Sequence, residues 1–438
     1  MNYEVDFVKA IFKAFEKENI EFCVLRNADE VESGDAHDID MTADADRLVD
    51  VENIMLRVAD ECGWKMHIKI GSPKDKTNIK CYHFYFADES KKEIHIAHFD
   101  VFPTFAWKGY VLLENLCLIN NIDSGSEIHK SDASVEAVTK LFIRLLHNGY
   151  IKSKYKEYIQ VVFSSHGEAV KNLMKNFLDN DTVQFVYQNV MNSEWSKIEA
   201  ERDRIVGAVQ KFARKSKGSY NRYLLKKLKG KPGLMVAFEG TDGSGKSTII
   251  NGLEQVPESS FPDGMLDYYH WRPGFIKKEK QTANGEAIIV TEPHAKKPYG
   301  RTKSFLKFSF FNLDYFLGYW FKVRWQLSKG HLVVFDRYYY DYYMDKIRYR
   351  LSISDRVLDF FRFMIPKPDV SFLLIGDPQV LYERKKEIDV SEIEAQIQRL
   401  RANENKFAHA VEIDVNASVD DVVFCVAKEI LNSCSRNY

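Results

Sequence analysis

The chain has few cysteines, and their placement argues against two kinds of stabilisation. No two of them form a Cys-x-x-Cys pair in a chain of 438 residues (Cys23, Cys62, Cys81, Cys117, Cys425 and Cys434). This spacing argues against a zinc site, and a disulfide framework is not expected in a chain of this length. A reducing, cytoplasmic compartment is the simplest expectation.

Long apolar runs and an excess of one charge are also missing. No run of 18 apolar residues occurs, so no membrane span is expected. The N-terminal stretch "MNYEVDFVKAIFKAFEKENI" mixes charged and apolar residues and lacks the apolar centre of a signal peptide. The formal net charge is −1, so the molecule has no bulk attraction to nucleic acid, and none is expected as a partner.

The length and the residue patterns predict several domains. Apolar and polar residues in the first 105 positions alternate between helical and strand periods, which is typical of a small mixed α/β unit. Amphipathic helical spacing follows, and a basic stretch then leads to a fresh series of alternating strands and helices. We interpret the basic stretch as a solvated linker, with a phosphate-binding arm as the alternative. The predicted divisions are 1–126, 127–215 (helical), 216–232 (linker) and 233–438.

A phosphate-binding loop is the strongest motif. The stretch "GTDGSGKS" matches G-x-x-x-x-G-K-[ST], follows the apolar strand pattern "LMVAF" and precedes the helical pattern "STIINGLEQV". Glycines allow a tight turn whose N–H groups point at phosphate oxygens, and the helix that follows adds its positive end. Lys246 can reach the β- and γ-phosphates, and the Ser247 hydroxyl can bind magnesium.

Further motifs separate a kinase from other nucleotide-binding proteins. "HLVVFDRY" places Asp336 and Arg337 at the carboxyl end of a strand, where ligands bind in parallel sheets. "HWRPGF" contributes Arg272, and "LIGDPQVLYERKKE" contributes Arg384 and Lys385. With "EGTDGSGKST" and "PDVSFLLIGDP", these segments make residues 233–438 resemble the thymidylate-kinase-like P-loop kinases.

This resemblance implies a fold, two cofactors and a set of roles. The implied fold class is α/β, a P-loop kinase with a parallel sheet and helices on both faces. Arg272 and Arg337 would clamp an acceptor phosphate, Asp336 would position the acceptor or the metal's waters, and Arg384 would belong to a mobile lid. ATP and Mg²⁺ would be the cofactors, with the nucleotide held by the loop (Gly240, Thr241, Asp242, Gly243, Ser244, Gly245, Lys246, Ser247 and Thr248).

The stretch "DRYYYDYYMDKIRYR", residues 336–350, departs from that family. Thymidylate kinases carry a Tyr-Gln pair here that helps to recognise the base, and this stretch has no glutamine. Helical spacing would place Arg337, Asp341, Asp345 and Arg348 on one face. Two interpretations stay open: the ion pairs brace a helix over packed tyrosines, or Asp341, Asp345 and Tyr338 bind the acceptor, which would suit a sugar.

The N-terminal unit carries a second candidate site. In "HDIDM", Asp38 and Asp40 point the same way along a strand, about 6.6 Å apart, and Asp100 in "IHIAHFDVF" is a third carboxylate. "VLRNADEVESGDAHDIDMT" resembles the nucleotidyltransferase superfamily, whose metal site has this form. The Gly-Ser turn of active members is replaced by "LRN", where Arg26 could substitute electrostatically.

Three functions follow as hypotheses. The first is an ATP-dependent kinase acting on a phosphorylated small molecule, with thymidylate or another nucleoside monophosphate as the family default and a sugar or sugar phosphate as the alternative. The second is nucleotide transfer by the N-terminal domain. The third is a non-catalytic, ATP-binding regulatory protein. The oligomeric state is open, a homodimer included.

Overall fold

The structure, a computed structural model, contains two compact units. It describes residues 3–36, 38–71, 73, 81–88, 94–120, 122, 128–216, 230–253, 261, 266–276 and 297–436. Unit 1 comprises residues 1–88 and 95–227, and unit 2 comprises residues 89–94 and 228–438. The predicted boundaries at 126 and 215 both fall within unit 1 and stay predictions, and most of the predicted linker lies outside the described residues.

Unit 1 begins with a mixed five-stranded sheet in the order β1-β2-β5-β4-β3. Strand β2 runs parallel to β5, and the other neighbours are antiparallel. These strands are β1 (Phe22–Val24), β2 (Ile39–Ala43), β3 (Lys65–Ile70), β4 (Tyr82–Asp88) and β5 (His95–Val101). The helices beside them are α1 (Tyr3–Lys17), α2 (Ala28–Ser33), η1 (Ala45–Arg47) and α3 (Leu48–Cys62).

The two faces of this sheet differ in chemistry. Side chains alternate between the faces of a strand, so Phe84 and Phe99 enter the core formed with α1 and α3. His83 and Asp100, their neighbours in sequence, belong to the opposite face. The fold therefore gathers polar side chains from β2, β4 and β5 on one surface.

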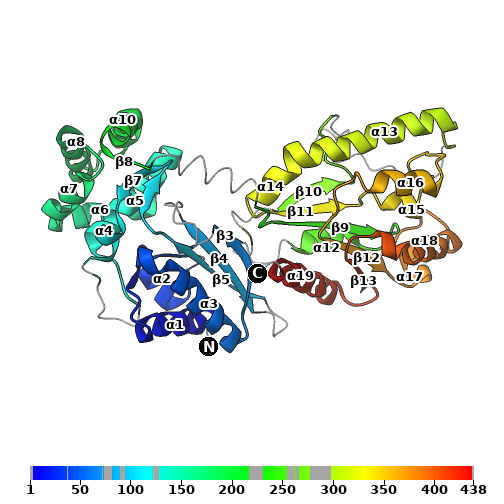
Figure 1. The fold of residues 1–438 in the computed structure, drawn as a ribbon, viewed down its shortest axis with the longest axis horizontal. Coiled ribbons are helices and arrows are strands. Elements are labelled where there is room, and N and C mark those ends of the chain that lie inside the picture. The colour runs from blue at the N-terminus through cyan, green and yellow to red at the C-terminus, as the bar shows by residue number, and fades with distance from the viewer. Residues whose placement is uncertain are drawn as a thin grey trace. The chain divides into compact units, whose positions relative to one another are not determined.

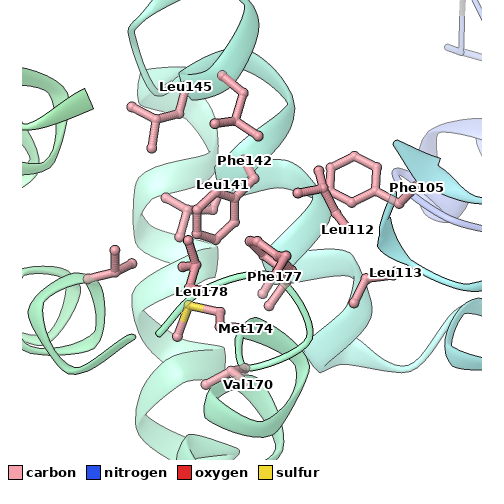
Figure 2. Packing of buried hydrophobic residues seen from close by; sticks show 14 of the residues in the cluster. Phe105, Leu112, Leu113, Leu141, Phe142, Leu145, Val170, Met174, Phe177 and Leu178 are labelled. Carbon is pink, nitrogen blue, oxygen red and sulfur yellow. The ribbon is translucent and has the colours of Figure 1, made fainter. Parts of the chain in front are cut away.

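The remainder of unit 1 is mostly helical. Buried side chains of α5 and the segment 170–178 pack with Phe105, Leu112 and Leu113 from the small sheet β6-β7-β8 (Figure 2). The elements are β6 (Phe105–Trp107), β7 (Tyr110–Leu113), α4 (Asn115–Ile119), α5 (Ala133–Asn148), α6 (Ser153–Ser165), α7 (Gly167–Met174), α8 (Asn180–Met191), α9 (Trp195–Ala200), α10 (Arg202–Phe212) and β8 (Arg214–Lys215).

Unit 2 contains a five-stranded, wholly parallel sheet in the order β10-β11-β9-β12-β13. Helices α13 and α14 lie along one face, and α12 and α19 along the other (Figure 1). The predicted fold class, a parallel sheet with helices on both faces, is confirmed. Its strands are β9 (Leu234–Gly240), β10 (Leu266–His270), β11 (Leu332–Asp336), β12 (Val370–Ile375) and β13 (Ala410–Asp414).

The described helices of unit 2 vary in length. None of the helices that the structure describes, in either unit, is long and apolar enough to cross a membrane. Those of unit 2 are α12 (Lys246–Gly252), α13 (Arg301–Gly318), the π-helical turn η5 (Tyr319–Val323), α14 (Arg324–Ser328), α15 (Asp341–Met344), α16 (Asp355–Arg362), α17 (Pro378–Arg384), α18 (Val390–Ala402), η6 (Glu404–Lys406) and α19 (Val419–Ser435).

Two local predictions are wrong. The polar stretch "ADEVESGDAH", residues 28–37, has the composition of a loop, and a loop is what the sequence predicts there. The structure instead places the short helix α2 in it, with Gly34 at its C-terminal end in a left-handed φ of 83°. The segment 337–348, expected as one helix, has only the single turn α15, because Arg337 takes a left-handed φ of 72° and Asp345 an extended φ of −144°. The expected shared face of four charged residues therefore does not exist as a helical face.

Candidate functional sites

The phosphate-binding loop connects the centre of the unit 2 sheet to helix α12. Strand β9 is buried throughout, and Gly245 precedes the helix with a φ of 81°. Gly243 has a φ of 84°, and a Cβ there would lie 2.5 Å from the carbonyl oxygen of Leu381. Only glycine fits that position without strain, so the sequence pattern is explained by the backbone geometry.

Lys246 is held by oxygen atoms of its own loop. Its Nζ donates hydrogen bonds to the carbonyl oxygens of Gly240 (2.8 Å) and Thr241 (2.9 Å) and to Oγ of Ser244 (3.2 Å). Burial, together with the nearby charge of Arg337, lowers the pKa of Lys246 to about 8. Ser247 and Thr248, in the first turn of α12, are exposed.

The carboxylate of Asp242, in the same loop, is bound by two arginines. Arg337 Nη2 lies 2.7 Å from Oδ1, and Arg348 Nη1 lies 2.6 Å from Oδ2. Burial alone would raise the pKa of Asp242, but Arg337 and Arg348 hold it well below its usual range. The loop is therefore tied to the segment after β11 by buried charge.

Arg337 continues this chain of charges. Its Nη1 donates a hydrogen bond to Asp341 Oδ1 (2.8 Å), and the Tyr349 hydroxyl donates to Oδ2 of the same carboxylate (2.5 Å). The successive contacts join Arg348, Asp242, Arg337, Asp341 and Tyr349, and we term this set the buried ion-pair network. Asp341 is fully buried, and each of its carboxylate oxygens has a hydrogen-bond partner within the protein.

The remaining predicted acceptor contacts are also internal. Asp345 accepts hydrogen bonds from the backbone N–H of Arg348 (3.0 Å) and from Gln396 Nε2 (3.4 Å). The Tyr338 hydroxyl donates to the carbonyl oxygen of Pro366 (2.6 Å). The tyrosines of the stretch are all buried (Tyr338, Tyr339, Tyr340, Tyr342, Tyr343 and Tyr349). The tyrosines therefore pack as core, as the structural interpretation expects, but not beneath the helix that it assumed, and the acceptor-binding role of Asp341, Asp345 and Tyr338 stays a prediction.

Asp336 ends strand β11 and has one unsatisfied oxygen. Its Oδ2 accepts a hydrogen bond from the Tyr268 hydroxyl (3.2 Å) and lies 3.7 Å from His270 Nδ1. Its Oδ1 is buried and has no hydrogen-bond partner among the described residues. Burial opposes ionisation, but His270 and Lys246 lower the pKa of Asp336 to about 2. An ionised carboxylate with a free lone pair thus sits beside the loop lysine.

Arg272 is a buried, oriented arginine. Its Nη1 lies 2.6 Å from Asp314 Oδ2, and Asp314 also accepts the backbone N–H groups of Gly274 (3.0 Å) and Ile276 (2.6 Å). The guanidinium lies 5.5 Å from the centre of the Trp271 ring, and its Nε has no hydrogen-bond partner among the described residues. Arg272 is therefore held in place by Asp314, and its Nε–H group can still donate a hydrogen bond to a ligand.

The predicted lid residues lie beside the loop, but their side chains turn elsewhere. Arg384 is exposed, and its Nη1 donates to the carbonyl oxygen of Val415 (3.1 Å). Lys385 forms an ion pair with Glu387 (3.1 Å). The Leu381 carbonyl packs close to Gly243, so the segment adjoins the loop, and the lid role stays a prediction.

Three contributors escaped the sequence analysis. Glu239, which precedes the loop, is fully buried, accepts the Tyr338 backbone N–H (3.0 Å), and has its pKa raised well above the usual range by burial and by Asp341. A carboxylate in an otherwise apolar strand was the available signal, as was Asp314 within "FFNLDYFLG". Tyr349 had no local signal, although its partner Asp341 lies only eight positions away. Arg348 was placed on a shared face by helical spacing, but its ion pair with Asp242 spans 106 positions.

Unit 1 brings its three predicted carboxylates together. Ligand oxygens of Asp38, Asp40 and Asp100 all lie within 4.8 Å of one another. The parallel pairing of β2 and β5 explains this, because Asp40 is directly opposite Asp100. An all-oxygen set of this kind suits a hard divalent ion such as Mg²⁺, so the residues fit the predicted metal.

Arginine and histidine side chains also surround these carboxylates. Arg26 Nη2 lies 2.5 Å from Asp40, and His83 Nδ1 and His98 Nε2 each lie 2.6 Å from Asp100 Oδ1. Burial raises the pKa of Asp40 to about 6 against the opposing effect of Arg26. The pKa of Asp100 is lowered by the two histidines despite its burial. Arg26 therefore pairs with one of the predicted metal-binding carboxylates, and its expected role toward the phosphates of a nucleotide stays a prediction.

Comparison with known proteins gives one informative similarity. No protein-family model matches the chain. A curated protein of Methanosarcina barkeri, described as a probable thymidylate kinase, is 28% identical over 218 residues, which cover 47% of this chain and 99% of the relative. Among solved structures, thymidylate kinase from Ehrlichia chaffeensis shows 17% identity and a TM-score of 0.31, covering 46% of this chain and 100% of that one. About half of this chain is therefore similar to a probable thymidylate kinase, and the other half lies outside that similarity.

Proposed function

We propose that unit 2 is an ATP-dependent kinase that transfers the γ-phosphate to a phosphorylated small molecule, with thymidylate or another nucleoside monophosphate as the default acceptor. The observation that carries the proposal is that four charged side chains lie at the carboxyl ends of neighbouring strands. Lys246 follows β9, Arg272 follows β10, Asp336 ends β11 and Arg337 comes directly after it. These strands are parallel, so the four side chains share the edge at which ligands bind in such folds.

The donor side would be built from the loop and its neighbours. Backbone N–H groups of the loop and the Lys246 ammonium would hold the phosphates of ATP, since the lysine's present partners are carbonyl and hydroxyl oxygens that a phosphate can replace. The exposed Ser247 hydroxyl and the unsatisfied Oδ1 of Asp336 would bind Mg²⁺ or its waters. Bound ATP would supply the phosphoryl group, and Mg²⁺ would neutralise part of the negative charge on the phosphates.

The acceptor side would be built from arginines and aromatic rings. Arg272 is preoriented by Asp314, and Arg337 would exchange part of its contact with Asp242 for an acceptor phosphate. Trp271 and Tyr349 are stacked with ring centres 4.6 Å apart. Because Asp341 and Asp345 already have protein partners, aromatic contacts are the better candidates for recognition. This favours a nucleotide base over a bare sugar.

The test is a phosphoryl-transfer assay on the full chain. Purified protein with Mg-ATP is incubated with nucleoside monophosphates, sugars and sugar phosphates, and formation of ADP and phosphorylated product is measured. We expect transfer to a nucleoside monophosphate that Lys246→Ala abolishes and that Lys428→Ala, an exposed lysine on α19, preserves. Tight ATP binding without transfer to any acceptor would instead support the regulatory alternative.

A second candidate function concerns unit 1. The proximity of Asp38, Asp40 and Asp100 favours nucleotide transfer onto a small molecule or protein. This activity would release pyrophosphate from a nucleoside triphosphate. It should disappear in Asp38→Asn and persist in Lys246→Ala, which separates it from the kinase.

A further inference from the structure

A second set of metal-binding groups lies on the polar face of the unit 1 sheet. One ligand atom from each of Cys81, His83 and Asp100 can be chosen so that all lie within 4.8 Å of one another. This set shares Asp100 with the carboxylate group and replaces Asp38 and Asp40 by a thiol and an imidazole. Its chemistry is therefore different from that of the all-oxygen set.

Strand geometry fixes these three side chains. Cys81 directly precedes β4 and His83 is its second residue, so the two are separated by one position in extended chain and share a face. His83 is directly opposite Asp100 in the antiparallel pairing of β4 and β5. The intervening Tyr82 is buried in the core on the other side. The juxtaposition follows from sheet register and not from a loop.

The donor types select a class of metal ion. A thiolate, an imidazole and a carboxylate are ligands for a borderline ion such as Zn²⁺, whereas Mg²⁺ prefers oxygen ligands alone. We propose that Cys81, His83 and Asp100 bind a divalent ion of the zinc class, and that this site is distinct from any magnesium site of the kinase unit. Three protein ligands leave a fourth tetrahedral position for water or a ligand group.

Neighbouring groups support this assignment. His98 Nε2 lies 2.6 Å from the same Asp100 oxygen that His83 contacts, so it is placed to orient the carboxylate as a positioning residue. The Cys81 thiol currently donates to the Tyr82 carbonyl oxygen at 3.6 Å. On binding, the thiol would lose its proton to solvent, and its sulfur would turn to the ion. The direct contact between His83 Nδ1 and Asp100 Oδ1 would be replaced by a bond from each residue to the ion.

The proposed site does not depend on the spacing of cysteines along the sequence. The sequence argues against zinc because it contains no Cys-x-x-Cys pair. Here a single cysteine is combined with a histidine two positions later and an aspartate from the adjacent strand. Only the sheet brings the third ligand near the first two.

Cobalt substitution tests the proposal directly, because a cobalt–thiolate bond produces a near-ultraviolet charge-transfer band that oxygen and nitrogen ligands do not. The full chain is stripped with a chelator, kept reduced and titrated with Co²⁺, and Zn²⁺ is then added in competition. We expect a saturable charge-transfer band with tetrahedral d–d bands, both removed by stoichiometric Zn²⁺.

Matched variants assign the ligands. Cys81→Ser should lose the charge-transfer band, whereas Cys62→Ser, at the exposed cysteine that ends α3, should keep it. His83→Gln should keep the band but weaken cobalt binding by about tenfold or more. Asp38→Asn should leave band and affinity unchanged, because Asp38 belongs only to the all-oxygen set.

Three outcomes would overturn the proposal. They are absence of any cobalt–sulfur band in the native chain, persistence of the band in Cys81→Ser, and unchanged affinity in His83→Gln. Far-ultraviolet circular dichroism of each variant establishes that it is folded, and the His83 variant keeps the test decisive if Cys81→Ser does not fold. Kinase activity is a separate readout, so either proposal can fail alone.

Discussion

Arg337 and Asp242 form a buried ion pair, with 2.7 Å between guanidinium and carboxylate, that joins the end of β11 to the phosphate-binding loop. Both side chains are nearly inaccessible to solvent. The contact links a residue expected to bind the acceptor with a loop expected to bind the donor. Several expected outcomes follow from it and from its surroundings.

Removing the charge of Asp242 should destabilise unit 2. In Asp242→Asn, Arg337 loses one of its two carboxylates and Arg348 loses its ion pair with Asp242, so the free energy of unfolding should fall by about 3–5 kcal/mol. Urea denaturation followed by circular dichroism measures this. Asp420→Asn, at an exposed carboxylate on α19, is the control and should change the value little. Equal stability of the two variants would contradict a structural role for the network.

The kinase reaction should lose activity as the pH rises through about 8. Burial lowers the pKa of Lys246 to about 8, and a neutral amine holds phosphate poorly. Because kcat/KM reports the free enzyme, its value for ATP should fall by about tenfold per pH unit well above that pKa. Lys246→Arg, if active, should lack this basic limb, since a guanidinium stays charged. An unchanged limb in that variant would assign the titration to another group.

The same shift has a consequence for stability, with the opposite sign. The folded-state pKa of Lys246 lies below its unfolded value of 10.5, so between pH 8 and 10.5 the unfolded chain binds more protons. Stability should therefore rise with pH in this window. Comparison with Lys246→Met by denaturant titration at several pH values isolates the contribution, because the variant lacks the ionisable group. A parallel pH dependence in both proteins would show that Lys246 contributes nothing.

Two glycines of opposite environment provide a matched pair. Gly243→Ala combines a left-handed φ of 84° with a Cβ that would lie 2.5 Å from the Leu381 carbonyl oxygen, so ATP binding should weaken by about tenfold or more. Gly207→Ala, within α10 and with no atom within 4 Å of the added Cβ, should stabilise its helix by about 0.5–1 kcal/mol. Calorimetric titration with ATP and thermal melts check the two. Unaltered ATP affinity in the first variant would mean that the loop can relax.

The aromatic pair should determine acceptor affinity. Trp271 stacks on Tyr349, whose hydroxyl bonds to Asp341, so Trp271→Leu removes a ring surface while leaving the loop intact. We expect an increase in KM for the acceptor of about tenfold and little change in KM for ATP. Steady-state kinetics with each substrate varied separately measures both. Equal effects on the two KM values would point to a general loss of structure.

The sequence predicted the parts of the site that depend on local geometry. The loop, its flanking strand and helix, and the position of Asp336 and Arg337 after β11 all follow from short-range pattern. The helix expected from 337 to 348 failed because periodicity cannot detect a left-handed Arg337, which buries its guanidinium between carboxylates from two segments. The ion pair between Arg272 and Asp314 spans 42 positions and depends on how α13 packs.

In unit 1, too, the sequence predicted features that depend on local geometry and missed those that depend on distant contacts. Alternation along β2 and β5 placed Asp40 and Asp100 on one face, as strand geometry requires. The helix α2 was missed because it has six residues and begins after Asn27, whose φ of 58° no propensity rule anticipates. The contacts of His83 and His98 with Asp100 depend on the antiparallel register of β4 and β5, which the sequence does not state.

In the proposed kinase, the buried ion-pair network would also select what can enter the acceptor side. Arg337 would give up a buried carboxylate only to a competitor of comparable negative charge, and a phosphate dianion meets that requirement while a hydroxyl does not. A nucleoside or sugar without a phosphate would leave the ion pairs of Arg337 intact, so Arg337 would not be available to bind it. The phosphate of the ligand would thus be selected before its base makes any contact. The negative charge of that phosphate would itself open the binding site, by displacing a carboxylate from Arg337.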